Sequence, residues 1–580
     1  MRSYRTIALA TLALTSMLPA CGAAPNAKEA SYAPAPADAG GASQAAYPQP
    51  HAQPGQAPTM DSAGATAPAE EAEAPMDADA APPQPAPVAQ RQVLEKKTAA
   101  AKPPAIAGGA VANDDGHGTE DYTDYGVNPV TDPAKDPLST FAIDVDTGAY
   151  AIARSKLRSN TLPPFQSVRA EEFVNYFDYE YQGPTDGSPF AVQLHAAPSP
   201  YQRGHQILRV GVQAKRVSKA QRKPVHLVYL VDTSGSMTAA NKLGLAKKSL
   251  KILTKELKPT DTVALCTYAG STRLVLPPTA GSNRSEILKA IDDLTSGGGT
   301  AMSNGMEMAY ELAQKTHVRG HVSRVIVLSD GDANIGRNSH QSILERIGHF
   351  KDQGITLSTV GFGRGNYKDT MMEQLANEGD GNYSYIDTEA EARRAFGEQL
   401  GGMLEVVAKD VKIQVEFDPR VVQSYRLIGY ENRDVADKDF RNDKVDAGEI
   451  GAGHDVTALY DVVLKGQPSR DRSPVIVRLR HKKPQGTRAV EMAVKMGPED
   501  VSTTFASSPA SYRFAVGVAG LAEVLRKSPH AKSWSLSTVE RIVDQARWGQ
   551  KEQNELLALV RTARRLSPEP KRGGPAIMAK

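Results

Sequence analysis

A short apolar run in the middle of the chain constrains the fold more than any other feature of the sequence. Residues 227–231 are continuously apolar over the length of a strand, which is typical of a strand buried on both faces. Strand and helix patterns alternate from there to Gly401, as they do in parallel sheets covered by helices on both faces. The sequence therefore predicts an α/β domain over residues 223–401, with a doubly wound, mostly parallel, Rossmann-like sheet.

The elements expected in this domain follow from the period of its apolar residues. Further strands are expected at residues 262–268, 272–276, 325–328, 356–360 and 383–386, the second of them antiparallel to the first. Helices are expected at residues 243–257, 285–294, 303–314, 340–353, 369–376 and 390–401. Asn283 is expected to cap the second of these helices.

The regions on either side of this domain have a different character. The N-terminal flank, residues 121–222, is expected to contain strands at residues 141–146 and 206–213 and helices at residues 150–157 and 169–179. The C-terminal flank, residues 402–568, begins with alternating polar and apolar residues, as in half-buried strands. We expect a small β-sandwich there, followed by helices; the strands are at residues 411–417, 456–464, 475–479 and 490–494, and the helices at residues 512–525, 536–546 and 552–566.

The first 120 residues are expected to form a targeting signal and a tether. Arg2 and Arg5 precede an apolar segment, residues 7–18, that is too short for a typical membrane span. The run Leu-Pro-Ala-Cys-Gly that follows resembles a bacterial lipobox, so residues 1–20 are expected to be a lipoprotein signal peptide and Cys21 the lipidated residue. An ordinary secretory signal is the alternative. Residues 21–120 are rich in Ala and Pro and poor in large aliphatic side chains, which predicts a disordered tether.

Charge and cysteine content exclude some classes of protein. The formal net charge is only +2, so charge gives no argument for a nucleic-acid partner. The chain has two cysteines, Cys21 and Cys266, which excludes a disulfide framework. Cys266 lies in an apolar run and is expected to be a buried, unreactive side chain.

Hydroxyl and carboxylate side chains follow three separate elements of the expected sheet. One group directly follows the strand at residues 227–231, another residue follows three consecutive glycines, and a third position follows the strand at residues 325–328. Ligands of parallel sheets bind beyond the carboxyl ends of the strands. Oxygen donors alone suit a hard cation such as Mg²⁺, and the lack of Cys and His disfavours zinc. The candidate ligands are Asp232, Ser234, Ser236, Thr300 and Asp330.

This ordered set resembles the metal-ion-dependent adhesion site (MIDAS) of von Willebrand factor type A domains. The resemblance covers about residues 223–401, and all five positions match the pattern. It implies that Ser234, Ser236 and Thr300 bind the ion through their hydroxyls, and that Asp232 and Asp330 bind it directly or through water. It also implies that Mg²⁺, or Mn²⁺ or Ca²⁺ in its place, offers an open coordination position to a carboxylate of a protein partner. Residues 139–179 and 411–464 resemble the accessory modules of bacterial von Willebrand factor A lipoproteins.

Other polar groups give weaker indications. Residues 297–299 could belong to a phosphate-binding loop, but no Gly-Lys-Ser/Thr follows them. Asp332 and Asn334 could add ligands or form a solvated turn. Asp144 and Asp146 have calcium-like spacing without the other ligands of an EF-hand, so we prefer a turn at a strand end. His454 has no evident nucleophile as a partner, and we interpret it as structural.

Together these features predict a binding protein of the bacterial cell envelope rather than an enzyme. The hypothesis is adhesion to an acidic group on a protein partner through the divalent cation, with the membrane contacted through the lipid. The alternative is a structural assembly scaffold in which the ion only stabilises the loops. A hydrolase is poorly supported, because no general base accompanies the site. Gly22 replaces the Asp that often marks inner-membrane retention, which favours the outer membrane.

Overall fold

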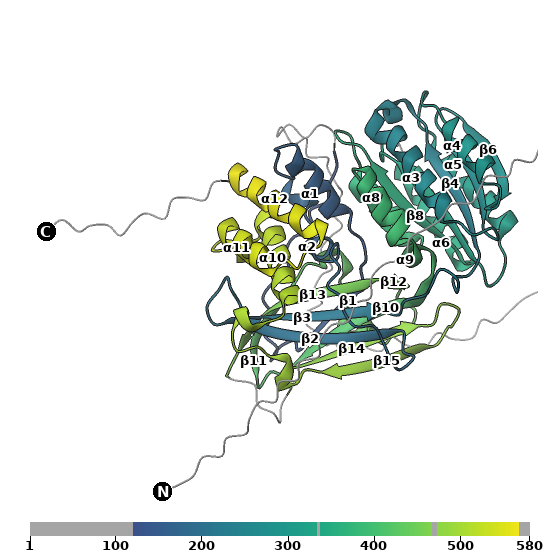
Figure 1. The fold of residues 1–580 in the computed structure, drawn as a ribbon. Helices are drawn as coiled ribbons and strands as arrows, with labels where there is room; N and C mark the ends of the chain where they lie inside the picture. The colour runs from purple at the N-terminus through teal and green to yellow at the C-terminus, as the bar shows by residue number, and fades with distance from the viewer. Residues whose placement is uncertain (1–119, 333–336, 467–472, 568–580) are drawn as a thin grey trace, which may run out of the picture. The chain divides into compact units, whose positions relative to one another are not determined.

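A six-stranded sheet forms the centre of the α/β domain (Figure 1). A computed structural model describes residues 120–332, 337–466 and 473–567 of the chain. The strands run in the order β6-β5-β4-β7-β8-β9, all parallel except β6, which is antiparallel to β5. They are β4 (Val225–Asp232), β5 (Thr262–Tyr268), β6 (Thr272–Ala280), β7 (Val322–Ser329), β8 (Ile355–Phe362) and β9 (Tyr383–Ile386). The prediction of a doubly wound, mostly parallel sheet is confirmed.

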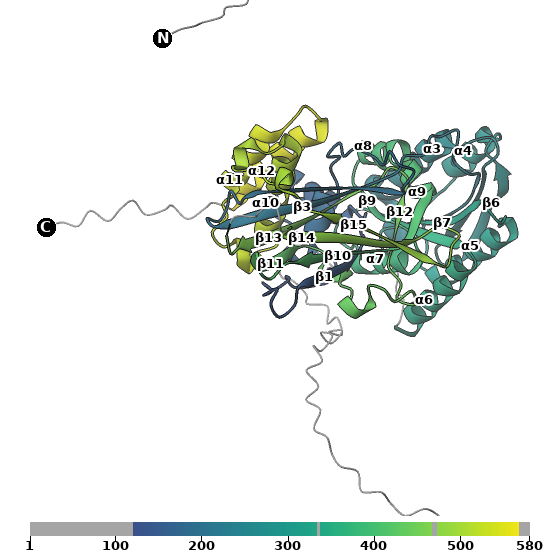
Figure 2. The same cartoon turned by 90° about the horizontal axis from the view of Figure 1, so that it is seen from below.

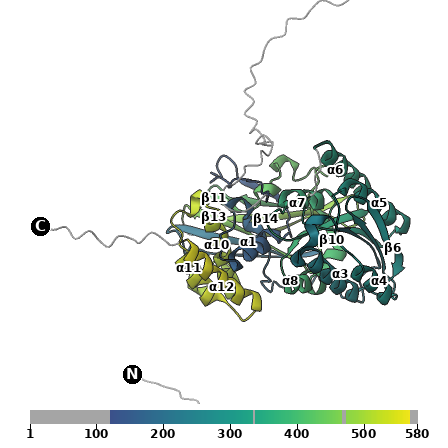
Figure 3. The ribbon, with the colours of Figure 1, turned by 90° about the horizontal axis from the view of Figure 1, so that it is seen from above.

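Helices cover both faces of this sheet, which is why residues 227–231 of β4 are all apolar. Leu227 and Tyr229 pack with α3 and α4, whereas Val228 and Leu230 pack with α5 and α6. Figures 2 and 3 show α3, α4 and α8 on one side of the sheet and α5 and α6 on the other. The helices are α3 (Leu245–Glu256), α4 (Arg284–Asp292), α5 (Met302–Thr316), α6 (Arg337–Asp352), α7 (Asp369–Glu378) and α8 (Glu389–Arg393).

The expected closing helix at residues 390–401 is interrupted. After α8 the chain forms a π-helical turn at Arg394–Glu398 and then a short helix, α9 (Leu400–Leu404). A π-helical turn widens the helix by one residue, which re-aims the side chains that follow it. The helix at residues 285–294 has Asn283 at its N-cap position, as predicted, but the Asn283 side chain makes no capping hydrogen bond.

The N-terminal and C-terminal flanks share two further sheets (Figure 1). One contains β1 (Leu138–Ala142), β10 (Val406–Phe417), β12 (Gly448–Gly451), β14 (Val475–Lys482) and β15 (Ala489–Lys495). The other contains β2 (Phe190–Pro198), β3 (His205–Ala214), β11 (Val422–Ile428) and β13 (Asp455–Leu464). Their inner faces meet in a single core. In this core the rings of Phe417 and Tyr425 are stacked, with their centroids 4.0 Å apart. The sandwich predicted for the C-terminal flank thus includes strands from the N-terminal flank.

A helical layer packs beside the sandwich and again unites the two flanks. Its members are α1 (Gly148–Arg158), α2 (Ala170–Val174), α10 (Ala510–Leu525), α11 (Leu536–Ala546) and α12 (Lys551–Leu566). The expected helix at residues 169–179 is corrected, since α2 ends at Val174. The Asn175 side chain accepts a hydrogen bond from the Thr457 N–H at 2.8 Å and donates one to the Asp144 carbonyl at 3.0 Å. Both bonds fix the Asn175 side chain at the point where the helix ends. No helix among the described residues is long and apolar enough to cross a bilayer.

Candidate metal centre

The loop that follows β4 brings three of the candidate ligands together. Asp232, the last residue of the strand, is completely buried. Its Oδ1 accepts the N–H of Ser234 at 2.9 Å, and its Oδ2 accepts the hydroxyl of Ser329 at 2.8 Å. The hydroxyl oxygens of Ser234 and Ser236 lie 3.0 Å apart. A carboxylate and two hydroxyls therefore converge at the carboxyl end of the central strand.

Backbone hydrogen bonds dock the glycine-rich loop onto this turn. The Gly235 N–H donates to the Gly298 carbonyl at 3.0 Å, and the Gly297 N–H donates to the Thr233 carbonyl at 2.8 Å. Gly298 has a φ of +88°, a backbone conformation that is energetically unfavourable for residues other than glycine. The loop places Thr300, which is half-buried, directly after this docked segment.

Asp330 enters the site from the neighbouring strand. β7 pairs with β4 in parallel, so both strands end at the same edge of the sheet. Asp330 directly follows β7 and is completely buried. Ser329 joins the two loops, because its hydroxyl donates to Asp232 while its Oγ accepts the Gly331 N–H at 2.9 Å. The Asp332 N–H donates to Asp330 Oδ1 at 3.1 Å.

Lys242, which no pattern in the sequence indicates, brings a positive charge to the site. The Lys242 ammonium lies 2.8 Å from Asp330 Oδ2 and 2.7 Å from Asn366 Oδ1. Asn366 Nδ2 in turn donates to Asp332 Oδ2 at 2.9 Å. Lys242 precedes a helix rich in lysine, and Asn366 lies in a loop, so neither residue carries a local signal of this role.

Burial and charge affect Asp232. Burial raises the pKa of Asp232, hydrogen bonds from Ser234 and Ser329 lower it, and the charge of Asp330 raises it further. A cation bound between the two carboxylates would offset their repulsion. The donor set consists of carboxylate and hydroxyl oxygens, which is the chemistry that Mg²⁺ prefers. The five residues thus fit a hard divalent cation.

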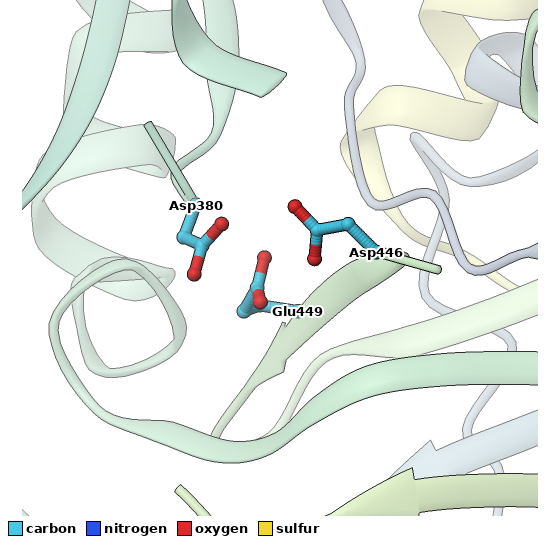
Figure 4. Close-up of side chains that lie close together, drawn as sticks. All are labelled: Asp380, Asp446 and Glu449. Carbon is cyan, nitrogen blue, oxygen red and sulfur yellow. The ribbon is translucent and has the colours of Figure 1, made fainter. Parts of the chain in front are cut away.

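A second group of carboxylates lies elsewhere and already has counterions. The side chains of Asp380, Asp446 and Glu449 point toward one another (Figure 4). The Lys351 ammonium lies 2.7 Å from Asp446 and 3.4 Å from Asp380, and Lys409 also lies 3.4 Å from Asp380. We interpret this group as an ion-pair cluster that joins the α7–β9 loop to β12 and the segment before it.

Asp144 and Asp146 form ion pairs as well. The strand expected at residues 141–146 is corrected, since β1 ends at Ala142 and both aspartates lie beyond its end. Arg433 Nη2 lies 3.2 Å from Asp144 Oδ1 and 3.0 Å from Asp146 Oδ2. The preferred interpretation, a turn at a strand end, agrees with this arrangement.

Of the remaining residues considered from the sequence, two have pKa values shifted by burial, and two lie outside the described residues. Burial raises the pKa of Cys266 to about 12, so its thiol is protonated and unreactive. Burial, with the charges of Arg394 and Arg324, lowers the pKa of His454 to about 4, so its imidazole is neutral. Cys21 and Asn334 lie outside the described residues.

Family models match most of the folded chain. The model for the von Willebrand factor type A domain matches residues 226–398. A model described as von Willebrand factor matches residues 116–209, and one described as "Uncharacterized protein YfbK, C-terminal" matches residues 402–566.

Similar proteins come from bacteria and animals. "Uncharacterized protein YfbK" of Escherichia coli (strain K12) is 38% identical over 454 residues, which are 74% of this chain and 78% of that protein. Inter-alpha-trypsin inhibitor heavy chain H3 of Homo sapiens is 25% identical over 42% of this chain and 29% of its own length. Among solved structures, von Willebrand factor type A from Catenulispora acidiphila is 16% identical over 66% of this chain and 91% of that chain, with a TM-score of 0.39. The chain therefore belongs to the YfbK family and contains a von Willebrand factor type A domain.

Proposed function

We propose that the α/β domain binds a protein partner through a divalent cation held by Asp232, Ser234, Ser236, Thr300 and Asp330. The observation that carries the proposal is the convergence of the Asp232 loop, the glycine-rich loop and Asp330 at one edge of the sheet. Bound Mg²⁺ would supply a coordination position for a partner's carboxylate, since Mg²⁺ keeps exchangeable water ligands in protein sites.

The exposed glycines of the two loops, which we call the rim of the site, favour access by a partner side chain. Gly235 and all three glycines at residues 297–299 are exposed. Glycine has no side chain that would obstruct an approaching carboxylate. Ser236 and Thr300 are half-buried, so both residues are partly accessible from solvent.

The alternative role for the ion, that of stabilising the loops, has less support. Direct hydrogen bonds already connect the loops, including Gly235 to Gly298 and Ser329 to Asp232. Loops that protein groups hold in place depend less on an ion for their order. We therefore favour a binding role.

We also propose that the protein is anchored in the cell envelope through a lipid on Cys21. The support is the lipobox-like run and the Ala- and Pro-rich segment after it. A tether of the kind that this composition predicts would let the binding domain reach a partner at some distance from the membrane. Gly22, in place of the Asp that often marks inner-membrane retention, favours an anchor in the outer membrane.

The binding proposal is tested by metal-dependent capture with the full chain. Immobilised protein is incubated with envelope extract in Mg²⁺ or in EDTA, and the captured proteins are compared by mass spectrometry. We expect a partner that is retained only with Mg²⁺ and is lost with the Asp232→Ala and Ser236→Ala variants. Asp293→Ala, which removes an exposed carboxylate at the end of α4, is the matched control. Equal capture by wild type and Asp232→Ala would show that the cation does not mediate binding.

A further inference from the structure

The site contains a protein cation in contact with one of its own candidate ligands. Lys242 lies in the π-helical turn Ala240–Gly244 that precedes α3. Its ammonium is 2.8 Å from Asp330 Oδ2 and 2.7 Å from Asn366 Oδ1. The residue is only 7% exposed, so its charge is held in the interior and not in solvent.

Neighbouring residues fix the conformation of the Lys242 side chain. Gly363 has a φ of +84°, and a Cβ at this position would lie 2.4 Å from Lys242 Cε. Only glycine leaves room for the lysine stem there. Asn366 holds the ammonium end of the lysine side chain. Its side-chain oxygen accepts a hydrogen bond from the ammonium, while its side-chain N–H donates one to Asp332 Oδ2. The contact with Asp330 is thus supported from two sides.

Hydrogen-bond donors compensate most of the negative charge of Asp330. Oδ1 accepts the Asp332 N–H at 3.1 Å. Oδ2 accepts the Lys242 ammonium at 2.8 Å and the Asn366 amide at 3.3 Å. A divalent cation that approaches this carboxylate meets the repulsion of a fixed positive charge beside it, and such repulsion is weakly screened in a buried site.

We propose that Lys242 is an internal competitor of the divalent cation. The ammonium neutralises Asp330 in the absence of the ion and lowers the affinity of the site for it. Binding of the ion then weakens or breaks the contact between Lys242 and Asp330. Lys242 thereby sets the concentration of divalent cation at which the site is filled. This inference rests on the proposed function, because it assigns the regulation of the same site.

The test compares Mg²⁺ affinity in full-length wild type and Lys242→Met by titration calorimetry at constant pH and ionic strength. Methionine keeps the unbranched stem that passes Gly363 and removes the charge. Lys248→Met is the matched control, because Lys248 lies on α3, is 62% exposed and pairs with Glu389. Lys242→Arg retains the charge and is the conservative variant. Lys242→Gln replaces Lys242→Met if the latter loses its cooperative thermal unfolding.

We expect Lys242→Met to bind Mg²⁺ about 10-fold more tightly than wild type, as removal of one nearby unit charge should allow. Lys248→Met and Lys242→Arg should stay within about two-fold of wild type. Unchanged or weaker binding by Lys242→Met, with measurable binding by wild type, would overturn the inference and leave the proposed metal site standing. Binding by neither wild type nor Lys242→Met would overturn both.

Discussion

The hydroxyl of Ser329 donates a hydrogen bond to Asp232 Oδ2 at 2.8 Å and so connects two loops that begin on neighbouring strands. The same oxygen accepts the Gly331 N–H. Ser329 thus orients a candidate ligand on β4 and the turn that carries Asp330. A residue that orients ligands in this way affects metal affinity without touching the ion.

Replacement of Ser329 by Ala should therefore lower Mg²⁺ affinity at least about 10-fold, in the range found for partners of metal ligands. Titration calorimetry measures the change. Ser323→Ala is the control, because Ser323 is also buried on β7 and bonds to His317 at the other end of the strand. Similar Mg²⁺ affinities of the two variants would contradict the positioning role of Ser329.

Gly298→Ala should loosen the docked glycine-rich loop. Its φ of +88° is unfavourable for alanine, and a Cβ would lie 3.3 Å from the Gly270 nitrogen. We expect the free energy of unfolding to fall by about 1 kcal/mol and Mg²⁺ affinity to fall with it. Gly297→Ala is the adjacent control, since a Cβ there meets nothing within 4 Å. Chemical denaturation should separate the two variants, and equal stability would argue against the strained turn.

An ion pair between the N-terminal flank and the α/β domain predicts that the two unfold together. Arg169 Nη1 lies 2.5 Å from Asp369 Oδ2, and both side chains are buried. Arg169→Met leaves Asp369 without this partner, so we expect a loss of about 3 kcal/mol in the free energy of unfolding. Arg393→Met, which breaks the exposed pair with Glu389 on α8, should change stability little. Separate unfolding transitions for flank and domain would contradict this coupling.

The sequence was most informative where a site is contiguous. Asp232, Ser234 and Ser236 follow a strand whose apolar run identifies it as central, so their place at the carboxyl edge of the sheet could be predicted. Thr300 and Asp330 added the order that makes the pattern specific. Lys242 could not be found in this way, because it meets Asp330 only through the fold.

The flanks were harder to predict because their strands pair across the inserted α/β domain. β3 pairs with β13, and β1 with β10, yet each strand has only a local pattern. The helix expected at residues 169–179 was extended too far because Phe173 and Phe177 keep a helical spacing. Both are buried, but the helix ends at Val174, and the next residue, Asn175, bonds to β13.

Acid should weaken the α/β domain through Glu391. Burial opposes its ionisation, but Arg394 and Arg154 lower the pKa of Glu391 from its ordinary value of 4.5 to about 2. A lowered carboxyl pKa contributes stability that is complete above about pH 4.5 and is lost as the pH falls toward 2. The stability difference between wild type and Glu391→Gln should therefore shrink across this window in denaturant titrations. Glu311→Gln, at an exposed position of α5, is the control, and a pH-independent difference for Glu391→Gln would contradict the lowered pKa of Glu391.

Cys21→Ser should release the protein from the membrane. If the lipid on Cys21 is the anchor, the variant should move from the membrane pellet to the soluble fraction after cell fractionation. Cys266→Ser changes the other cysteine and should stay in the pellet. Retention of Cys21→Ser in the membrane fraction would contradict the lipid anchor.

The proposed divalent-cation site of five oxygen-bearing side chains is tested by Mg²⁺ titration of the full chain. We expect a single saturable site in wild type, with a rise in melting temperature as Mg²⁺ is added. Asp232→Ala and Ser236→Ala should lose both effects, while Asp293→Ala keeps them. Absence of Mg²⁺ binding by wild type, or unchanged binding by Asp232→Ala, would contradict the proposed metal site.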